Sequence, residues 1–317
     1  MERNLKIDIA KGIGIFLMVF AHGKAPICLH NFIYAFHMPL FFILAGCFYN
    51  PIKYYNSIFF IKTRILNLLV PFLCFAILNF ICLNMIGYVN IDNGVKTIMN
   101  STLWFLPVLF LSEVIFHFLQ KINKNLFFII ISCIGSAILG YLLNIENIHT
   151  ISKLENSFMG LFFYGIGFTI KDFILDNKRI NSIYLLISTG LFFIISNILP
   201  SIDMFSNNVG LFPLNQISAI IGTIIIIEIS DKFHNLHQLI TIFLNWAGKN
   251  TLTILGLSQL PLIVIDYFWP KSIYGSIYYT LGKYIFLWIF LYVISILFNK
   301  YLPFVVGKIK KSAKNSV

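Results

Sequence analysis

Two neighbouring stretches, DIAKGIGIFLMVFAH at residues 8–22 and FHMPLFFILAG at residues 36–46, decide what kind of fold this chain adopts. Both are apolar, yet they contain four titratable side chains: Asp8, Lys11, His22 and His37. Such a side chain is costly in hydrocarbon, so inside an apolar helix it marks a functional site by default. The two stretches therefore predict membrane helices that carry chemistry.

The composition of the whole chain supports the same prediction. Hydrophobic residues make up 58% of the 317 residues, charged residues make up 11%, and the mean hydropathy is +0.85. Soluble domains contain roughly 45–50% apolar and about 25% charged residues. Since one crossing takes about 20 residues, the length accommodates roughly ten helices and leaves nothing for a soluble catalytic module. The expected fold class is all-α, a polytopic membrane helix bundle.

Apolar runs of spanning length support this number of helices, and the charges between them give an orientation. Eighteen of the 23 Lys and Arg residues fall on the side of the two termini, and five fall on the other side. Cytoplasmic loops carry the excess of Lys and Arg, so both termini are expected in the cytoplasm. The mixed segment 231–249 is expected to hold a short interfacial or re-entrant piece at 238–246. The ten predicted runs cover residues 8–25, 31–49, 65–86, 103–119, 126–143, 157–173, 181–199, 213–229, 250–268 and 282–299.

The basic residues lie at the ends of apolar runs and not along a polar stripe with interleaved aromatic residues. The net charge of +11 is therefore attributed to membrane topology, and nucleic acid is not an expected partner. His234 and His237 share a helical spacing but lack the acidic or Cys partners of a metal site, so no metal is expected. We expect one transmembrane domain over residues 1–307 and a basic cytoplasmic tail over residues 308–317.

The titratable residues of the first two runs have positions that suit proton transfer. Asp8 and Lys11 are one helical turn apart and can pair on one face of a helix. His22 lies three turns further toward the outer end, and His37 lies in the next, antiparallel helix, so that both imidazoles can face one cavity. An imidazole with an ordinary pKa of roughly 6.5 is a competent base for a hydroxyl proton. We predict catalytic roles for these four residues.

Further motifs follow along the chain in a recognisable order. FIKTR at residues 60–64 leads into LLVPF at 68–72, LWFLP at 103–107 opens the next apolar run, and GKNTL at 248–252 lies near the start of the penultimate run. Together with the first two stretches, these motifs resemble the integral-membrane acyltransferase-3 family, and most closely its fucose 4-O-acetylase-like branch. The chain departs from that pattern at three positions, where many members have Gly or Ser, a second Arg and a late His: Ala21, Asn67 and Ser258.

The resemblance implies an enzyme, an O-acyltransferase that takes an acyl group, expected to be acetyl, from cytoplasmic acyl-CoA. It implies His22 as the base or relay, so His22 is ranked first among the catalytic candidates and His37 second. The implied acceptor is a hydroxyl of a glycan or glycolipid that belongs to the cell envelope or is exported. A composition rich in Ile, Asn and Lys favours a bacterial source, so we expect a multi-pass protein of the cytoplasmic membrane in contact with its lipids.

Other side chains are candidates for holding the two substrates. Lys62 and Arg64, at the cytoplasmic end of the third helix, can hold the phosphates of coenzyme A, since a guanidinium binds phosphate bidentately. The alternative is that they anchor the helix to lipid head groups. Trp104 and Phe105 either stack on a sugar ring or belong to the interfacial aromatic belt. Glu113 lies one to three turns deeper, where it either pairs with a cation or orients a His.

Two other functions are compatible with the same residues. The first is a proton-coupled transporter or flippase of a glycan or lipid-linked sugar, in which Asp8, Lys11 and the two His residues relay protons. The absence of a visible internal repeat argues against it. The second is a non-catalytic subunit of a polysaccharide machine, which predicts that His22 and His37 can be replaced without loss of function. Turnover of acyl-CoA separates these functions from the acyltransferase.

Overall fold

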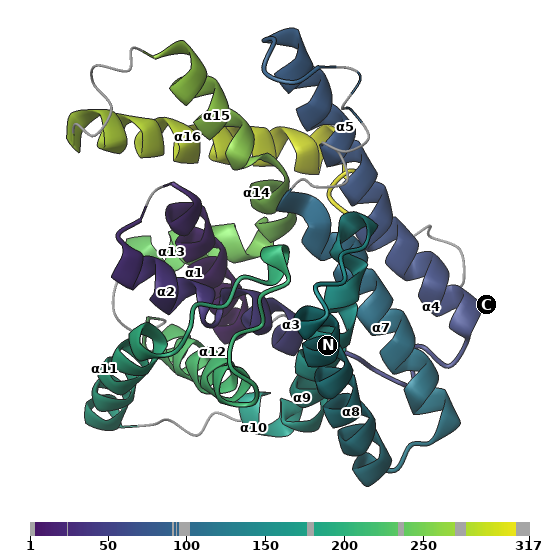
Figure 1. Ribbon diagram of the computed structural model, residues 1–317. Helices are drawn as coiled ribbons and strands as arrows, with labels where there is room; N and C mark the ends of the chain where they lie inside the picture. The colour runs from purple at the N-terminus through teal and green to yellow at the C-terminus, as the bar shows by residue number, and fades with distance from the viewer. Residues whose placement is uncertain are drawn as a thin grey trace. The chain divides into compact units, whose positions relative to one another are not determined.

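A computed structural model describes residues 4–23, 25–90, 92, 94, 102–175, 181–233, 238–269 and 277–308. The regular structure of these residues is helical, and the only β-type pairing among them is an isolated bridge between Asp203 and Asn208. The elements, labelled in Figure 1 where there is room, are α1 (Leu5–His22), α2 (Ile27–Tyr34), α3 (His37–Cys47), α4 (Ser57–Arg64), the π-helical turn η1 (Ile65–Leu69), α5 (Val70–Met85), η3 (Thr102–Trp104), α7 (Phe105–Ile122), α8 (Leu126–Ile145), η4 (Ile151–Asn156), α9 (Ser157–Thr169), α10 (Lys171–Leu175), α11 (Ser182–Ile198), η5 (Met204–Ser206), α12 (Leu214–Phe233), α13 (Gln238–Lys249), α14 (Thr251–Leu257), α15 (Gln259–Phe268) and α16 (Ile277–Tyr301).

Asparagine side chains begin four of these helices. The amide oxygens of Asn4, Asn56, Asn125 and Asn181 accept hydrogen bonds from backbone N–H groups in the first turns of α1, α4, α8 and α11. The first N–H groups of a helix have no partner within the helix, so such a cap satisfies them. The apolar runs therefore start as helices at positions that the sequence itself marks.

Each of the ten predicted apolar runs contains a helix, which confirms a polytopic helical bundle. Within the described residues, seven helices are long and apolar enough to cross a membrane: 27–47, 57–85, 105–122, 126–145, 214–233, 251–268 and 278–301. The other three runs hold α1, which carries Lys6, Asp8 and Lys11, and the shorter helices α9 and α11. The number of crossings and the side of the termini stay predictions. The basic tail lies outside the described residues apart from Lys308.

The helices form two compact units, and each is described by itself. The first unit contains Met1–Tyr55 and Leu111–Thr251, and the second contains Asn56–Phe110 and Leu252–Val317. The chain runs continuously from the second unit into the first within α7. Both units are thus assembled from segments far apart in the sequence. The prediction of one domain over residues 1–307 stays a prediction.

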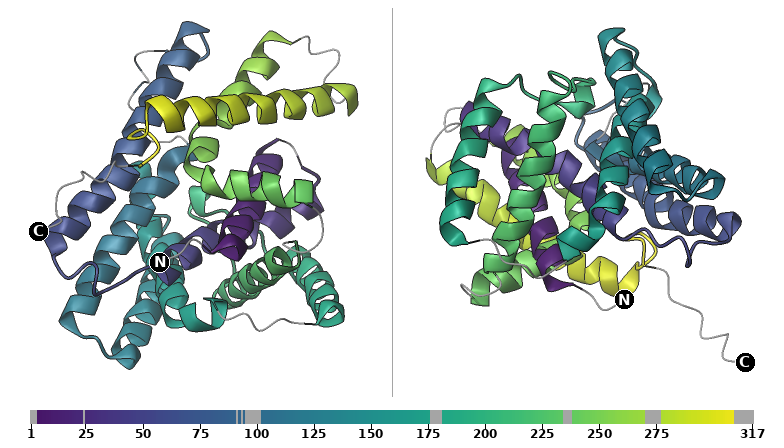
Figure 2. Two further views of the ribbon diagram at one scale, coloured as in Figure 1. Left: turned by 180° about the vertical axis from the view of Figure 1, so that it is seen from behind. Right: turned by 90° about the horizontal axis from the view of Figure 1, so that it is seen from below.

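In the first unit, two pairs of helices cross at glycine. A Cβ atom on Gly12 of α1 would lie 2.0 Å from the carbonyl oxygen of Leu244 in α13, and one on Gly248 would lie 1.7 Å from that of Asp8. The crossing of α3 and α9 has the same character at Gly46 and Gly167. Small residues let membrane helices approach this closely. Figure 2 shows α13 beside α1 from behind, so the short piece predicted at 238–246 is a helix packed on the first one.

Amide side chains fix the loop between α11 and α12 in the first unit. Asn156 donates to the carbonyl oxygen of Met204 at 2.6 Å, Asn215 donates to that of Pro200 at 2.9 Å, and Gln216 donates to that of Val209 at 2.8 Å. The side chain of Asn144 in α8 donates to the carbonyl of Asn207, which has a positive φ of 55°. Because three different elements hold it, this loop keeps a defined position for its side chains.

The second unit contains a long helix, residues 57–85, made of α4, η1 and α5. Asn79 of α5 donates to the carbonyl oxygen of Gly256 in α14 at 2.8 Å, and the rings of Phe75 in α5 and Phe298 in α16 stack at 5.9 Å. The turn after α16 reaches η1, where a Cβ atom on Gly307 would lie 2.9 Å from the carbonyl oxygen of Asn67. These contacts tie α5 to the C-terminal helices within this unit.

Candidate active site

The second apolar run is interrupted between Tyr34, the last residue of α2, and His37, the first residue of α3. Nδ1 of His37 forms a hydrogen bond with the carbonyl oxygen of Ile33, at 3.0 Å, across this interruption. A carbonyl only accepts, so the neutral ring carries its proton on Nδ1 and presents Nε2 as an acceptor. His37 is buried, with 4% of its surface exposed. Its ring is therefore held in one orientation and one tautomer.

The rings of four residues gather at this interruption, and we name them the histidine cluster: His22, His30, Tyr34 and His37. Tyr34 lies at the centre, with ring centroids 6.3 Å from His22, 4.8 Å from His37 and 3.9 Å from His30, on which it stacks. His22 is the last residue of α1 and is exposed. The structure thus brings His22 and His37 together around Tyr34.

A carboxylate from a distant part of the chain acts on this cluster. Asp203 belongs to the loop between α11 and α12, and its charge interacts with both His22 and Tyr34. The same carboxylate accepts hydrogen bonds from the backbone N–H of Phe205 at 3.0 Å and from the hydroxyl of Ser206 at 2.6 Å. The turn therefore fixes the carboxylate, and its charge acts on two members of the histidine cluster.

Sequence reasoning missed three residues of this site: His30, Tyr34 and Asp203. His30, Tyr34 and His37 have the spacing i, i+4 and i+7, which places side chains on one face of a helix, so the pattern was available. Asp203 had no such signal, because it lies in a loop far along the chain and reaches the cluster only through the fold.

Asp8 and Lys11 lie toward the other end of α1. At about 1.5 Å of rise per residue, Lys11 is some 16 Å along the helix axis from His22. Asp8 is buried where α13 crosses, and the Lys11 ammonium lies 5.2 Å from the centroid of the Phe48 ring. Two residues before Asp8, Lys6 of α1 forms a buried ion pair with Glu228 of α12 at 3.0 Å. The structure does not bring Asp8 and Lys11 to the histidine cluster.

The candidates for donor binding belong to the second unit. Lys62 is exposed and Arg64 is half-buried, with its guanidinium 5.4 Å from the centroid of the Phe60 ring. Both lie in α4, which begins at Ser57, so the helix extends further than the predicted run at 65–86. Arg64 directly precedes the π-helical turn η1, a feature frequent at functional sites. Their contact with coenzyme A stays a prediction.

The candidates for acceptor binding are divided between the units. Trp104 and Phe105 are buried residues of the second unit, with their rings edge-on at 6.5 Å. Glu113 is a buried residue of α7 in the first unit. Its neighbour Ser112 donates to the carbonyl oxygen of Ser157 at 2.9 Å and so joins α7 to α9. The roles of these three residues in holding a sugar stay predictions.

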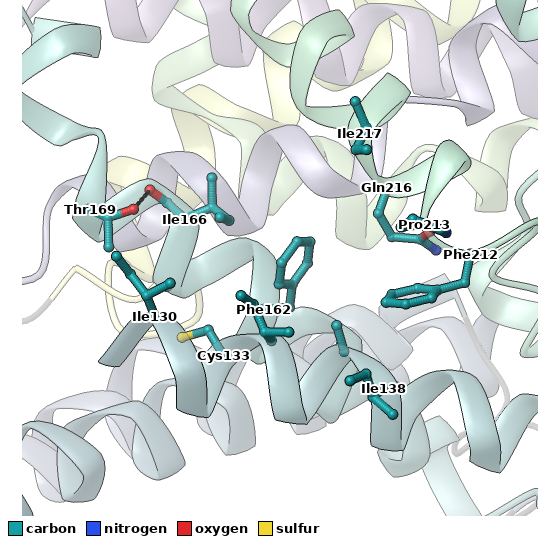
Figure 3. Close-up of a pocket in the computed structure, with 13 residues that line it drawn as sticks. Ile130, Cys133, Ile138, Phe162, Ile166, Thr169, Phe212, Pro213, Gln216 and Ile217 are labelled. Carbon is teal, nitrogen blue, oxygen red and sulfur yellow. Dashed lines mark hydrogen bonds between the residues drawn. The ribbon is translucent and has the colours of Figure 1, made fainter. Parts of the chain in front are cut away.

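A separate cavity of about 390 Å³ lies in the first unit between α8, α9 and α12 (Figure 3). Cys133 of α8, Phe162 of α9 and Phe212 before α12 are among the side chains that line it. Its described lining contains no histidine and no carboxylate. Without a base or a charged group, this cavity does not supply the chemistry that the histidine cluster offers.

The fold defines a multi-pass membrane protein, and the histidine cluster gives it a site with an accessible base. Among known protein families, the model of the family 3 acyltransferase domain matches residues 4–305. The chain therefore belongs to the acyltransferase-3 family, and the match covers both units. No curated protein and no solved structure gives a significant match.

Proposed function

We propose that this membrane acyltransferase moves an acetyl group from cytoplasmic acetyl-CoA to a hydroxyl of a cell-envelope or exported glycan, in the cytoplasmic membrane of a bacterium. Family membership supports acyl transfer in general. The observation that carries the finer proposal is the histidine cluster, in which an exposed imidazole is backed by a tyrosine and a second, fixed imidazole. An enzyme that acylates a hydroxyl needs such a base to make the acceptor nucleophilic.

In the proposed mechanism, His22 removes the proton of the acceptor hydroxyl while the oxygen attacks the thioester carbonyl. The C–S bond then breaks, the thiolate of coenzyme A leaves, and the imidazolium of His22 returns the proton to it. His22 is positively charged between these two steps, so the negative charge of Asp203 favours the intermediate state. His37 acts as a positioning residue, because its fixed ring packs against Tyr34 and thereby orients the Tyr34 ring beside His22.

Donor binding is assigned to Arg64, with Lys62 as a second cation. The Arg64 guanidinium can hold a phosphate bidentately. The continuous helix of α4 and the π-helical turn η1 holds the backbone of Arg64 in place. Coenzyme A carries three phosphate groups and is a cytoplasmic molecule, which suits cations at the predicted cytoplasmic end of the third helix. Replacing Arg64 by Lys keeps the charge and removes the fork, so it separates phosphate recognition from a simple topological role.

The test is turnover of radiolabelled acetyl-CoA by purified protein in nanodiscs, with His22→Ala compared with the wild type. Removal of a general base lowers the rate about 10²–10⁴-fold. His149→Ala is a matched control, because His149 is a half-exposed residue of the same unit that pairs with Glu155 at 3.7 Å. If the folded wild type neither binds nor cleaves acetyl-CoA, the donor is wrong and a proton-coupled transporter becomes the better explanation. Equal turnover by His22→Ala would instead overturn the assignment of the base.

A further inference from the structure

The second unit contains a cavity of about 560 Å³ between α15 and α16, here called the α15–α16 pocket. Its walls include the aromatic side chains of Trp269, Tyr278, Tyr279 and Phe286. Trp269, which directly follows α15, and Tyr279 of α16 both line it, with ring centroids 6.1 Å apart and planes tilted by 49°. Volumes of about 300–1,000 Å³ with aromatic linings are typical of small-molecule sites.

One charged side chain lines this pocket, and a neighbouring carboxylate forms an ion pair with it. Lys283, which lines it from α16, contacts both carboxylate oxygens of Asp266 in α15 at 2.6 Å. The Tyr279 hydroxyl donates to the same carboxylate at 2.5 Å, and the Lys283 ammonium lies 6.0 Å from the centroid of the Tyr279 ring. Lysine and aspartate neutralise one another here, so the pocket offers hydrogen-bond donors and acceptors without net charge. Phosphate would meet the Asp266 carboxylate, and such a pair therefore suits a neutral polar ligand better than an anion.

Glycine leaves one side of the pocket open. A Cβ atom on Gly282 would meet no other atom within 4 Å, although this residue lies inside α16 and lines the cavity. Tyr278, Gly282 and Phe286 follow one another at intervals of four along the same helix face. The missing side chain thus leaves open space on this face, between the positions of Tyr278 and Phe286.

We propose that the α15–α16 pocket binds a sugar residue, stacked on its aromatic walls and hydrogen-bonded through its hydroxyls to the Asp266–Lys283 pair. A pyranose has an apolar C–H face that packs on an aromatic ring and a rim of neutral hydroxyls that donate and accept hydrogen bonds. The pocket offers a partner for each. The alternative is that these aromatic residues belong to the interfacial aromatic belt of the membrane. That alternative explains the aromatic side chains but not the ion pair that contacts them. That the sugar belongs to the acyl acceptor rests on the function proposed above, whereas its binding does not.

Saturation-transfer NMR on the full-length protein in nanodiscs tests this proposal without acyl-CoA. The probes are the methyl glycosides of glucose, galactose and N-acetylglucosamine. We expect at least one of them to receive saturation from the wild type and the signal to fall about tenfold in Gly282→Leu, because the leucine side chain fills the gap. Gly190→Leu is the matched control, since a Cβ atom on this α11 glycine also meets nothing within 4 Å. His22→Ala should bind the glycoside as the wild type does, which separates this proposal from the proposed catalysis.

Two results would overturn the proposal. One is the absence of saturation transfer to any of the three glycosides, or equal transfer with the wild type and Gly282→Leu. The other comes from native mass spectrometry: a phospholipid that stays bound to the wild type and Gly190→Leu but is lost from Gly282→Leu, with no glycoside bound, would make the pocket a lipid site. Both leucine variants replace glycine inside a helix and raise helix propensity, so the fold is expected to persist.

Discussion

The crossing of α1 and α13 in the first unit and the α15–α16 pair in the second both depend on glycine, with opposite results. At Gly12 and Gly248 the missing side chain lets two backbones touch, so that even one added carbon has no room. At Gly282 the missing side chain leaves a hollow lined by aromatic rings. The first arrangement fixes the helix that carries His22, and the second leaves space for a ligand. Glycine in a membrane helix therefore indicates a close contact or an opening, and its neighbours decide which.

The strongest way to break this comparison is to add a side chain at each kind of glycine. Gly248→Leu should reduce the yield of folded protein severely, because its Cβ alone would lie 1.7 Å from the carbonyl oxygen of Asp8. Overpacking of a tight core costs about 1–3 kcal/mol and sometimes more, and here the obstructing atom belongs to a backbone. Thermal unfolding of purified protein in detergent measures the effect. Gly282→Leu serves as the paired variant, and similar destabilisation of both would show that the two sites do not differ.

Each of the two regions also contains an ion pair: Lys6 of α1 with Glu228 in the first unit, and Lys283 with Asp266 in the second. The two ion pairs differ in burial. Lys6 and Glu228 are 7% and 9% exposed, whereas Asp266 is 37% exposed. Lys6→Met leaves a buried carboxylate without its cation, which costs about 3–5 kcal/mol of stability. Lys283→Met leaves a carboxylate that water reaches, and the expected cost is about 1 kcal/mol or less.

Unfolding temperatures of the two variants check this order. The double variant Lys6→Met with Glu228→Gln removes both charges and should recover most of the loss caused by Lys6→Met alone. A double variant no more stable than the single one would contradict the view that the uncompensated carboxylate is the cause.

Variants of Asp203 show whether the first unit contributes to catalysis in addition to holding the helices in place. Asp203→Asn keeps an oxygen that can accept the N–H of Phe205 but removes the charge, so kcat should fall about tenfold while KM for the donor stays unchanged. Asp203→Glu should recover part of the rate. Ser206→Ala removes one hydrogen bond to the carboxylate and keeps its charge, so it serves as the control for the structure of the turn. A purely structural role predicts equal losses for Asp203→Asn and Ser206→Ala, with lowered unfolding temperatures.

The smallest effect is expected from a single methyl group at the open glycine. Gly282→Ala should leave stability unchanged or raise it by up to about 1 kcal/mol, because alanine has the higher helix propensity and its Cβ meets no neighbour. Gly12→Ala, with a Cβ placed 2.0 Å from the Leu244 carbonyl oxygen, should lower stability. Unfolding temperatures of the two alanine variants compare them directly, and a loss of stability in Gly282→Ala would mean that the pocket is closed in the membrane.

Much of the fold could be predicted because each apolar run carries its own signal. The helices at the predicted runs, the short separate segment at 238–246 and the proximity of His22 to His37 all follow from local patterns or from neighbouring segments. The long helix before residue 65 was underestimated, since FIKTR reads as a charged boundary although Asn56 caps a helix that continues through it. The approach of the Trp269 and Tyr279 rings to 6.1 Å has no signal in the local sequence.

The sequence by itself determined that this protein is a helical membrane bundle of the acyltransferase-3 family with titratable residues in its first two apolar runs. The reason is that hydrocarbon forces every backbone polar group to find its partner within the helix, so composition and apolar length decide the secondary structure. Only the tertiary structure decided which distant residues meet: Asp203 with His22, Glu228 with Lys6, and Asp266 with Lys283. These pairs depend on which helix faces pack together and on where glycine allows a close approach, and neither property is local to one stretch of sequence.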